Sequence, residues 1–380
     1  MNGFRLSLIG HLVIHLLLLW MVWKSTPKKS PWRRGVLIAV IFEMLLLSGF
    51  YAARWHLSRE VLTTVLRLFN SYYVAMLVYC TLVLIFFGVI ALLKRSPQLR
   101  TKEQRTRTRA YSMLAMIPVT LLLGLWGYHN TFSPVVKHYT VQTPGRESEE
   151  LKLVLVTDIH IGEIIGEKSV ARLVELVKAE EPDYVLVGGD ILDYLLEYGK
   201  DPEIIRMMDQ LHPNPQQKVV YILGNHEYYH QLKEKEAWLR QRGILLKDSV
   251  MPLTDQVWLI GRDEYHNKER LPLNELVAQL PEGAVKLLLD HQPVDPQEVR
   301  DNKINLSMHG HTHRGQFIPF KWLVELYFER AYGHYQKNDF THHIISSGYG
   351  VSTAPLRLGS RSEIVVIDLK VTPTPDLLQK

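Results

Sequence analysis

The distribution of apolar positions divides the chain into two halves. The first 130 residues contain four apolar stretches separated by short polar segments, at 6–23, 35–53, 72–93 and 110–129. Each has roughly the 20 residues that a helix needs to cross the hydrocarbon core of a bilayer. Aromatic side chains cluster near the ends of these stretches, as they do at membrane surfaces. The pattern therefore predicts four transmembrane helices.

The second half alternates between strand-like and helical patterns. Apolar runs of strand length occur at 151–157, 184–188, 219–223, 257–260, 285–289, 304–308, 343–346 and 363–369, and helical patterns at 168–179, 203–211, 232–241 and 273–280. Strands separated by helices imply βαβ units with largely buried sheets. The pattern therefore predicts an α/β domain.

A segment with turn signals joins the halves. Residues 131–150 carry Ser-Pro, Thr-Pro-Gly and a run of charges, which is typical of a linker, with one edge strand at 135–142. We therefore expect a membrane domain over 1–130, this linker, a catalytic domain over 151–370, and a tail over 371–380.

Charge separates the halves further. Residues 1–130 carry 16 Lys and Arg against three Glu, whereas the remainder carries 28 Lys and Arg against 36 Asp and Glu. The net charge of +5 hides this acidic second half, so the basic balance is no reason to expect nucleic acid binding. The only cysteine, Cys80, leaves no partner for an intramolecular disulfide and excludes a thiolate-rich metal site.

Basic residues concentrate in the first and third loops between the apolar stretches. These loops carry five and seven Lys or Arg, and the second loop carries three. The positive-inside rule places the first and third loops in the cytoplasm, so both termini and the whole second half would lie outside it. The first stretch is not typical of a signal peptide, because it lacks a small-residue cleavage site and runs into basic residues.

Some polar groups lie at membrane depth. His11 and His15 share a helix face, and Glu43 lies within the second stretch. Ionisable groups there are candidates for function, although we favour polar contacts between packed helices. Residues 57–69 show helical spacing of apolar and charged positions. Two interpretations of that segment are open, an interfacial helix on the outer surface and an extension of the third span.

Seven oxygen and nitrogen donors follow apolar runs in the second half. They lie in VTDIHIG, VGGDILD, LGNHE, LLLDHQP and HGHTH, and are Asp158, His160, Asp190, Asn225, His291, His311 and His313. Ligands of such folds gather at the carboxyl ends of strands, where we expect these groups to meet. The i, i+2 spacing within DIH and HTH places both side chains on one side of an extended backbone. Two glycines before Asp190 allow a tight turn and leave room for an ion.

This donor set indicates a metal-dependent hydrolase. Nitrogen and oxygen donors without thiolates suit Mn, Fe or Zn. Two cations about 3.5–4 Å apart can clamp the attacking and leaving oxygens of an in-line displacement and ionise a bound water near neutral pH. Each motif alone is common in unrelated loops. Five in this order, each after an apolar run, favour a two-metal phosphoesterase.

The order DxH, GD, GNHE, H and GHTH resembles the calcineurin-like metallophosphoesterase superfamily over most of residues 135–369. The chain is most similar to the bacterial branch typified by the YkuE- and YaeI-type phosphoesterases, through LLLDHQP, HGHTHRGQ and SSGYGVSTAPLRLGSRSEI. This resemblance implies an α-β-β-α sandwich. It also implies a multi-pass protein of the bacterial inner membrane, with its catalytic domain outside the cytoplasm by the loop charges.

The resemblance also implies roles for individual residues. One divalent ion would be held by Asp158, His160, Asp190 and His313, and a second by Asp190, Asn225, His291 and His311. His226 would lie beside the substrate, where it donates a proton to the leaving group or stabilises phosphoryl charge. His309 and Arg314 depart from the family pattern. We expect His309 to contact the metal ligands at most, and not the metal itself. Glu227 is expected to have a structural role.

Arginine placement restricts the substrate. Protein phosphatases of this superfamily carry phosphate-binding arginines near the GD and GNHE motifs, but GGDILDYL and YILGNHEYY contain none. This argues against phosphoprotein substrates. Arg357 in APLRLG is a candidate substrate-binding residue, with an ordinary turn salt bridge as the alternative.

Four predicted spans beside a phosphoesterase suggest a substrate at the membrane surface. We hypothesise a membrane-anchored enzyme that uses a metal-bound hydroxide to hydrolyse phosphomonoesters or phosphodiesters, including lipid-linked ones. Small soluble esters are the alternative. Hydrolysis of UDP-diacylglucosamine in lipid A synthesis, an activity of relatives, would require a cytoplasmic domain. A non-catalytic membrane sensor or scaffold is the alternative from another class.

Overall fold

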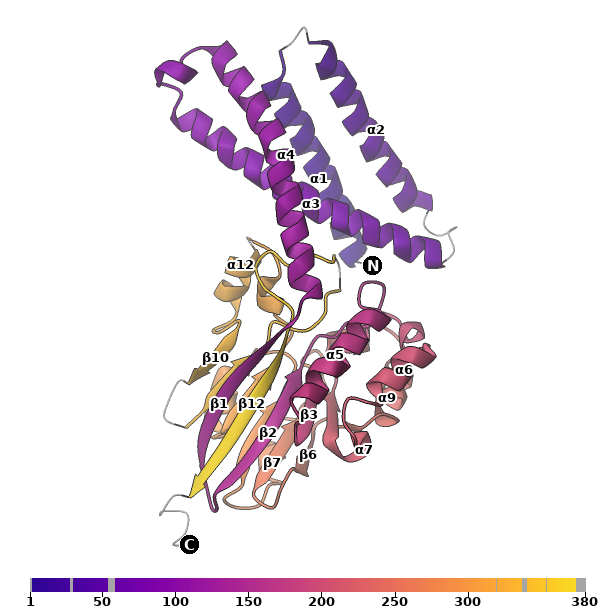
Figure 1. The fold of residues 1–380 in the computed structure, drawn as a ribbon, viewed down its shortest axis with the longest axis vertical. Coiled ribbons are helices and arrows are strands. Elements are labelled where there is room, and N and C mark those ends of the chain that lie inside the picture. The colour runs from indigo at the N-terminus through magenta and orange to yellow at the C-terminus, as the bar shows by residue number, and fades with distance from the viewer. Residues whose placement is uncertain are drawn as a thin grey trace. The chain divides into compact units, whose positions relative to one another are not determined.

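The computed structural model describes residues 2–27, 30–53, 59–318, 320–336, 340–352 and 354–373. They form two compact units, Met1–Trp126 and Gly127–Lys380, which we describe separately. Figure 1 shows helices alone in the first unit and mixed strands and helices in the second. The two patterns predicted along the sequence therefore correspond to two structural units.

Four long helices lie where the sequence predicts them. They are α1 (Asn2–Ser25), α2 (Pro31–Ala53), α3 (Arg59–Leu92) and α4 (Lys102–Phe132), with a 3-10 turn, η2 (Pro97–Leu99), before α4. Among the described residues, Leu68–Leu92 and Lys102–Phe132 are long and apolar enough to cross a membrane, and Ile9–Ser25 is apolar but shorter. Two candidate spans are thus found where four are predicted. The four-span membrane domain stays a prediction.

The polar groups of this unit contact one another. Nε2 of His15 lies 3.8 Å from Oε2 of Glu43, and its Nδ1 lies 2.8 Å from the carbonyl oxygen of His11. The first contact joins α1 to α2, as the sequence favours, and the second lies within α1. α3 is one unbroken helix from Arg59, so the described part of the 57–69 segment extends the third span. Residues 57 and 58 lie outside the described residues.

Two six-stranded sheets form the second unit. The first has the order β1-β12-β2-β3-β4-β5, with β1 (Val135–Gly145), β2 (Glu149–Val156), β3 (Tyr184–Gly188), β4 (Val219–Ile222), β5 (Ile244–Leu245) and β12 (Glu363–Pro373). The second has the order β10-β11-β9-β8-β7-β6, with β6 (Ser249–Pro252), β7 (Val257–Gly261), β8 (Val285–Leu289), β9 (Leu306–His309), β10 (Gly333–Gln336) and β11 (His342–Ile345).

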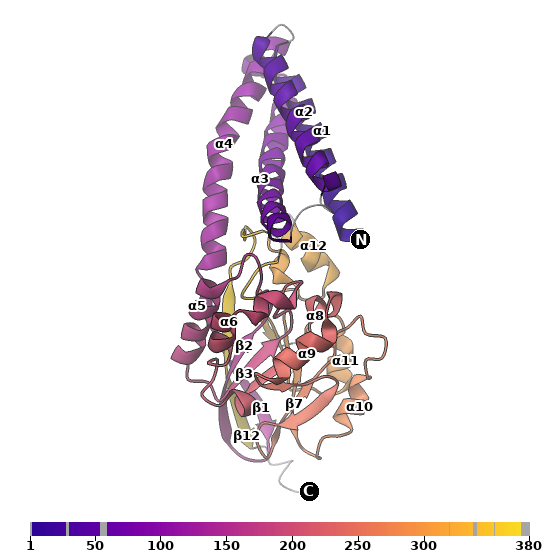
Figure 2. The same cartoon turned by 90° about the vertical axis from the view of Figure 1, so that its right-hand side faces the viewer.

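Helices cover the outer faces of both sheets (Figure 2). They are α5 (Glu167–Ala179), α6 (Pro202–Met208), α7 (Pro215–Lys218), α9 (Leu232–Arg240), α10 (Leu273–Val277) and α11 (Pro296–Asp301). The remaining helices, α8 (Asn225–Tyr229) and α12 (Phe320–Tyr327), and the 3-10 turns η3 (Leu196–Lys200) and η4 (His313–Gly315) belong to the loops after the strands. The buried residues of α5 follow i, i+3, i+4, i+7 spacing, as expected of a helix with one face against a sheet.

Three apolar clusters define the layers. Leu153 of β2 packs with residues of both sheets, whereas its neighbour Val154 belongs to the cluster that includes α5 and α6. Alternate residues of a strand point to opposite faces, so this strand is buried on both sides. Leu288 of β8 packs instead with residues of α10 and α11. The order is helices, sheet, sheet, helices, which confirms the α-β-β-α sandwich.

Parallel pairing places the carboxyl ends of neighbouring strands, which the predicted donors follow, at the same edge of each sheet. β2, β3, β4 and β5 pair in parallel, and so do β7, β8, β9 and β11. β1 is an edge strand, as predicted, and pairs in parallel with β12 over its whole length. The loops that follow the parallel strands therefore collect at one edge of each sheet.

Candidate metal centre

The seven predicted donors come from loops at strand ends in both sheets. Asp158 and His160 follow β2, Asp190 follows β3, and Asn225 opens α8 after β4. His291 follows β8, and His311 and His313 follow β9. The sandwich brings these loops together, because the carboxyl ends of parallel strands share an edge.

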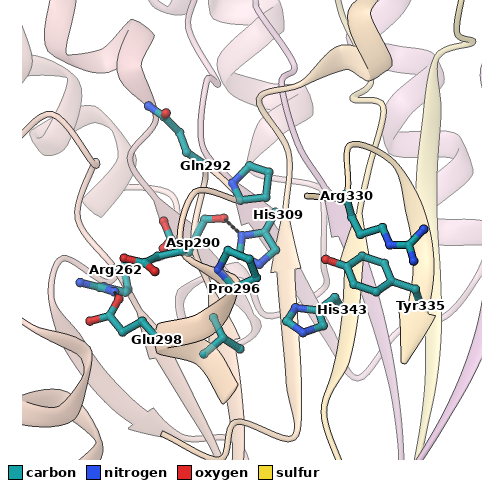
Figure 3. A pocket seen from close by; sticks show the side chains of 12 residues that line it. Arg262, Asp290, Gln292, Pro296, Glu298, His309, Arg330, Tyr335 and His343 are labelled. Atoms are coloured by element: carbon teal, nitrogen blue, oxygen red, sulfur yellow. Dashed lines mark hydrogen bonds and ion pairs between the residues drawn. The ribbon is translucent and has the colours of Figure 1, made fainter. Parts of the chain in front are cut away.

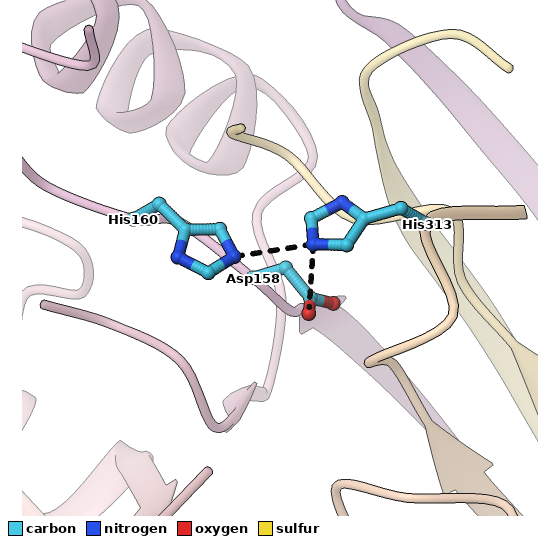
Figure 4. Close-up of side chains that lie close together, drawn as sticks. All are labelled: Asp158, His160 and His313. Carbon is cyan, nitrogen blue, oxygen red and sulfur yellow. Dashed lines mark hydrogen bonds and ion pairs between the residues drawn. The ribbon is translucent and has the colours of Figure 1, made fainter. Parts of the chain in front are cut away.

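Three donors form a first group (Figure 4). Asp158, His160 and His313 each offer one ligand atom, and these atoms lie within 4.8 Å of one another. Nε2 of His160 lies 3.1 Å from Nε2 of His313, which lies 3.5 Å from Oδ1 of Asp158. Two ring nitrogens and a carboxylate oxygen directed at one point are suitable ligands for a divalent ion.

A second group comprises Asp190, His291 and His311, whose ligand atoms also lie within 4.8 Å of one another. Oδ2 of Asp190 lies 3.2 Å from Nε2 of His291 and 3.8 Å from Nε2 of His160, a member of the first group. Oδ1 of Asp190 accepts a hydrogen bond from the backbone N–H of His226. The carboxylate of Asp190 therefore lies between the two groups.

Two buried donor atoms without a hydrogen-bond partner fit a bound cation. They are Nε2 of His291, which faces Oδ2 of Asp190, and Oδ1 of Asn225. The amide nitrogen of Asn225 donates to the Tyr229 hydroxyl at 2.8 Å, so its oxygen is the atom left available. Buried polar atoms in folded proteins are almost always bonded, and exceptions call for an explanation such as an ion. The donors present thus suit a divalent metal.

The backbone is strained where these donors converge. Asp158, His160, Asp190, His311 and His313 all have φ between 46° and 64°. The left-handed region costs non-glycine residues roughly 1–2 kcal/mol each, and such strain clusters at functional sites. Gly189, at φ 86°, approaches so closely that a Cβ atom would lie 2.7 Å from Nδ1 of His291. The loops are therefore packed closely enough to bring the donor side chains together, at the cost of strained backbone conformations.

Charge interactions set the protonation of the donors. Burial opposes ionisation of Asp190, but His291, His226 and His160 together hold its pKa well below the usual range. Burial likewise opposes charge on His291, but Asp190 raises the pKa of His291 to about 10. Burial and the charge of His291 lower the pKa of His311 to about 4. His311 is thus neutral near pH 7, which is the form that binds a metal.

Glu227 holds the loop that presents Asp190. Its buried carboxylate accepts hydrogen bonds from the backbone N–H groups of Gly224, Asp190, Ile191 and Leu192, at 2.9–3.0 Å. The buried ammonium of Lys235 donates to the carbonyl oxygen of His226 at 2.7 Å. Glu227 is therefore a structural support, and it fixes the loops after β3 and β4 against each other.

His226 lies beside the donor groups and is oriented by Asp193. Nδ1 of His226 is 2.9 Å from Oδ1 of Asp193, and the same oxygen is 3.5 Å from Nδ1 of His160. Burial lowers the pKa of His226, but Asp190 and Asp193 outweigh it and raise that pKa. Asp193 was not predicted from the sequence. Its spacing of three residues from Asp190 was the available signal.

Two tyrosines lie beside His226. The rings of Tyr194 and Tyr229 are 5.1 Å and 4.9 Å from the His226 ring, between centroids, and stack on each other at 5.8 Å. Both are partly exposed, and burial raises the pKa of Tyr194 to about 12. These rings give the region around His226 a partly aromatic boundary.

Comparison with known proteins agrees with this geometry. A family model described as calcineurin-like phosphoesterase matches residues 151–315. A protein of Helicobacter pylori (strain J99) named uncharacterized metallophosphoesterase is 30% identical over 272 residues, which cover 69% of this chain and 72% of the relative. The chain belongs to the calcineurin-like metallophosphoesterase family. It is a metal-dependent phosphoester hydrolase, and this argues against the scaffold alternative.

Two further relatives bear on the membrane prediction and on the predicted bacterial branch. A Danio rerio protein named transmembrane protein with metallophosphoesterase domain is 29% identical, and the match covers 76% of this chain and 71% of the relative. YkuE of Bacillus subtilis is 25% identical, with coverage of 58% and 79%. Such relatives and the two apolar helices suggest membrane association.

Arg357 of this metallophosphoesterase lies in the loop after β11. Its guanidinium group is fully buried and donates to the carbonyl oxygens of Ser347, Gly348 and Gly350, and to the Ser360 hydroxyl. None of these partners is a carboxylate, and a substrate-binding role for Arg357 stays a prediction. Its Nη1 and Nη2 groups donate to backbone carbonyl groups of the loop after β11 and so hold that loop, whereas its Nε has no hydrogen-bond partner.

Arg357 also influences one donor of the metallophosphoesterase site. Its Nη2 atom lies 3.2 Å from Nδ1 of His313. Burial and the nearby guanidinium charge hold the pKa of His313 well below its usual range. His313 is thereby kept in the neutral form that can bind a metal.

His309 faces a separate cavity of the metallophosphoesterase unit (Figure 3). Its Nδ1 lies 2.8 Å from the carbonyl oxygen of Asp290, and its Nε2 lies 2.9 Å from the Ser307 hydroxyl. Arg330 and Tyr335 also line this cavity. His309 thus supports the strand end behind His291 and is absent from both donor groups, as expected.

Proposed function

We propose that this protein is a membrane-anchored phosphoesterase with two divalent ions in each chain. Asp158, His160, Asp190 and His313 would hold one ion, and Asp190, Asn225, His291 and His311 the other. Mn, Fe and Zn suit these donors. The substrates would be phosphomonoesters or phosphodiesters.

The position of Asp190 carries this proposal. Its Oδ2 atom is 3.2 Å from a nitrogen of the second group and 3.8 Å from a nitrogen of the first. A carboxylate so placed suits a ligand shared by two ions. When bound, two such ions lower the pKa of a coordinated water and neutralise charge on the transferred phosphoryl group.

The side chains around the ions have distinct tasks. Nδ1 of His226 contacts Asp193, so Nε2 is the nitrogen available to give a proton to the departing oxygen. Asp193 fixes the ring orientation and favours its protonated form. Tyr194 and Tyr229 limit the access of water beside His226 and offer an apolar surface to the leaving group.

The leaving-group role of His226 gives the direct test. In His226→Ala, hydrolysis of an alkyl phosphodiester is expected to fall about 10²–10⁴-fold, because the alkoxide must leave without a proton. Hydrolysis of the p-nitrophenyl diester should fall much less, because p-nitrophenolate leaves readily. The measurement is kcat/KM for both esters with purified full-length protein.

His138→Ala is the matched control, because His138 lies on β1 with a side chain that is 55% exposed. It should leave both activities unchanged. Equal losses for both esters in His226→Ala would argue against proton donation and favour stabilisation of phosphoryl charge. No hydrolysis of either ester by the unaltered, metal-loaded protein would contradict the proposed function itself.

The membrane part of the proposal comes from the apolar helices and the loop charges. We infer a multi-pass protein of the bacterial inner membrane, with four spans and the catalytic unit outside the cytoplasm. Basic first and third loops support this orientation. A lipid-linked phosphoester is the substrate class that such an anchored site would encounter most often.

A further inference from the structure

One helix of the catalytic unit has its apolar side turned outward. α12 (Phe320–Tyr327) contains no buried residue. Its large apolar side chains are exposed, with Trp322 at 57%, Leu326 at 83% and Tyr327 at 79%. Lys321 and Val324, which lie on another side of the helix, are less exposed. Surface helices of soluble domains show the reverse arrangement, with the apolar stripe facing the core.

α12 is fastened directly to the turn that carries a predicted ligand. It follows η4, which begins at His313. Gly315 of that turn lies so close to α12 that a Cβ atom would be 2.4 Å from the Cα of Lys321. The outward apolar side is therefore held beside the metal groups.

An aromatic path joins the end of α12 to the second donor group. The rings of Tyr327 and Phe328 are 4.9 Å apart between centroids, and Phe328 is 6.2 Å from the ring of His311. Tyr327 is exposed, whereas Phe328 and His311 are half-buried. A partly apolar ligand that rests on α12 would thus meet aromatic rings between the helix and the second donor group.

The last turn of α4, residues 127–132, belongs to this unit and lies at the same end of it as α12 (Figure 1). Within this unit, the backbone N–H of Arg357 donates to the carbonyl oxygen of Gly127, and the Asn130 side chain donates to the carbonyl oxygen of Arg357. The next residue, Leu358, donates from its backbone to the carbonyl oxygen of Gln316, just before α12. One short loop therefore binds both the end of a candidate span and the segment leading into α12.

We infer that α12 is an interfacial helix that inserts its outward side into the phospholipid headgroup and acyl boundary. A helix with Trp, Tyr, Phe and Leu on one face is typical of such insertion. The end of α4 supplies the reason why lipid is near, since a span whose last turn is hydrogen-bonded to this loop would bring the bilayer surface close to it. The consequence for catalysis, that a phosphoester is taken from the lipid surface, rests on the proposed function.

Depth-dependent quenching tests the insertion in the full chain. Cys80→Ser removes the only cysteine, and Leu326→Cys or Tyr327→Cys then adds one exposed labelling site. The labelled protein is reconstituted into phosphatidylcholine and phosphatidylglycerol vesicles that contain lipids with a nitroxide on the acyl chain. We expect the nitroxide lipids to quench a fluorophore at either position strongly.

Glu282→Cys is the matched control. Glu282 is exposed in the turn before β8, at the opposite end of that strand from His291. A fluorophore there should not be quenched. Absence of quenching at both 326 and 327 would overturn the inference. So would a blue-shifted emission without lipid quenching, which would mean that protein covers α12.

A kinetic measurement separates this inference from the proposed function. Leu326→Asp should lower kcat/KM for a lipid-borne phosphodiester in vesicles by about tenfold or more, because burial of one leucine is lost. It should leave hydrolysis of a water-soluble p-nitrophenyl diester unchanged. If the variant hydrolysed the lipid-borne diester as fast as the unaltered protein does, the catalytic consequence would be overturned. Failure of the unaltered protein on both esters would contradict the proposed function, while the quenching result still decides insertion.

Discussion

At the scale of single residues, the site depends on how one carboxylate is shared. Oδ1 of Asp190 is fixed by the backbone of His226, which leaves Oδ2 facing nitrogens of both donor groups. An amide in its place would keep the shape and remove the charge. The Asp190→Asn variant therefore tests whether two ions share this carboxylate more directly than a larger substitution would.

We expect Asp190→Asn to lose metal and activity together. Alteration of groups behind a metal ligand already costs 10–100-fold, so loss of a shared ligand should lower hydrolysis by more than about 100-fold. Metal analysis of the purified protein should show fewer ions per chain than in the unaltered protein. Asp255→Asn, in an exposed turn, is the control. Unchanged metal content in Asp190→Asn would contradict the shared-ligand proposal.

The candidate ligands could be predicted because motif order and strand ends agree. The roles of Asp193 and Arg357 could not. Asp193 occupies a turn where a solvated carboxylate is equally consistent with the sequence. Arg357 binds carbonyl groups of Ser347 and Gly350, whose positions depend on the folded loop. Side chains that act by holding backbone leave little trace in a residue pattern.

At the scale of elements, the loops after β3 and β4 act as one piece. Four backbone N–H groups donate to the Glu227 carboxylate, and Lys235 donates to the next turn. These hydrogen bonds link the backbone that carries Asp190 to the backbone that carries Asn225. The positions of both residues should therefore change together when the hydrogen bonds to Glu227 are weakened.

Glu227→Gln should weaken metal binding without removing a ligand. The new amide group would place donor hydrogens against backbone N–H groups that need acceptors. We expect metal affinity to fall about 10–100-fold, measured by competition with a coloured chelator. Glu234→Gln, exposed on α9, should have no effect. Affinity equal to that of the unaltered protein would show that the carboxylate does not position the loops.

Long elements with clear periodicity were predicted, including β2, β3, β8 and α5. The two-residue strand β5 and the four-residue strands β6 and β10 were not, because pairing with neighbouring strands defines them. α12 was also missed. An apolar run of that length fits a strand or a helix equally, and its outward face depends on where the turn after His313 directs the chain.

At the scale of the whole molecule, charge and apolar content predict orientation. The first 130 residues are basic in their first and third loops, and the remainder of the chain is acidic. The division into two units was predictable from this contrast. The number of spans was not decided by it, since two helices meet the requirements for crossing among the described residues.

Fusion reporters test the predicted orientation. A green fluorescent protein attached after Lys380 should stay dark in cells, and alkaline phosphatase at the same position should be active, because each reporter works on one side of the membrane. The same fusions after Arg100, in the basic third loop, should give the opposite signals. Fluorescence of the Lys380 fusion would reverse the topology and favour a cytoplasmic substrate such as UDP-diacylglucosamine.

Only Ser133 and Pro134 separate α4 from β1. The last turn of α4 is also hydrogen-bonded to the catalytic unit, through Gly127 and Asn130, so more than the chain alone attaches the helix to that unit. If α4 spans a bilayer, the catalytic unit would stay beside the membrane surface, and the effective concentration of any membrane-borne ester near the site would be high. Modest intrinsic affinity would suffice for such substrates. A phosphoester dissolved in bulk solvent would gain nothing from this attachment, so the attachment would favour membrane-borne substrates.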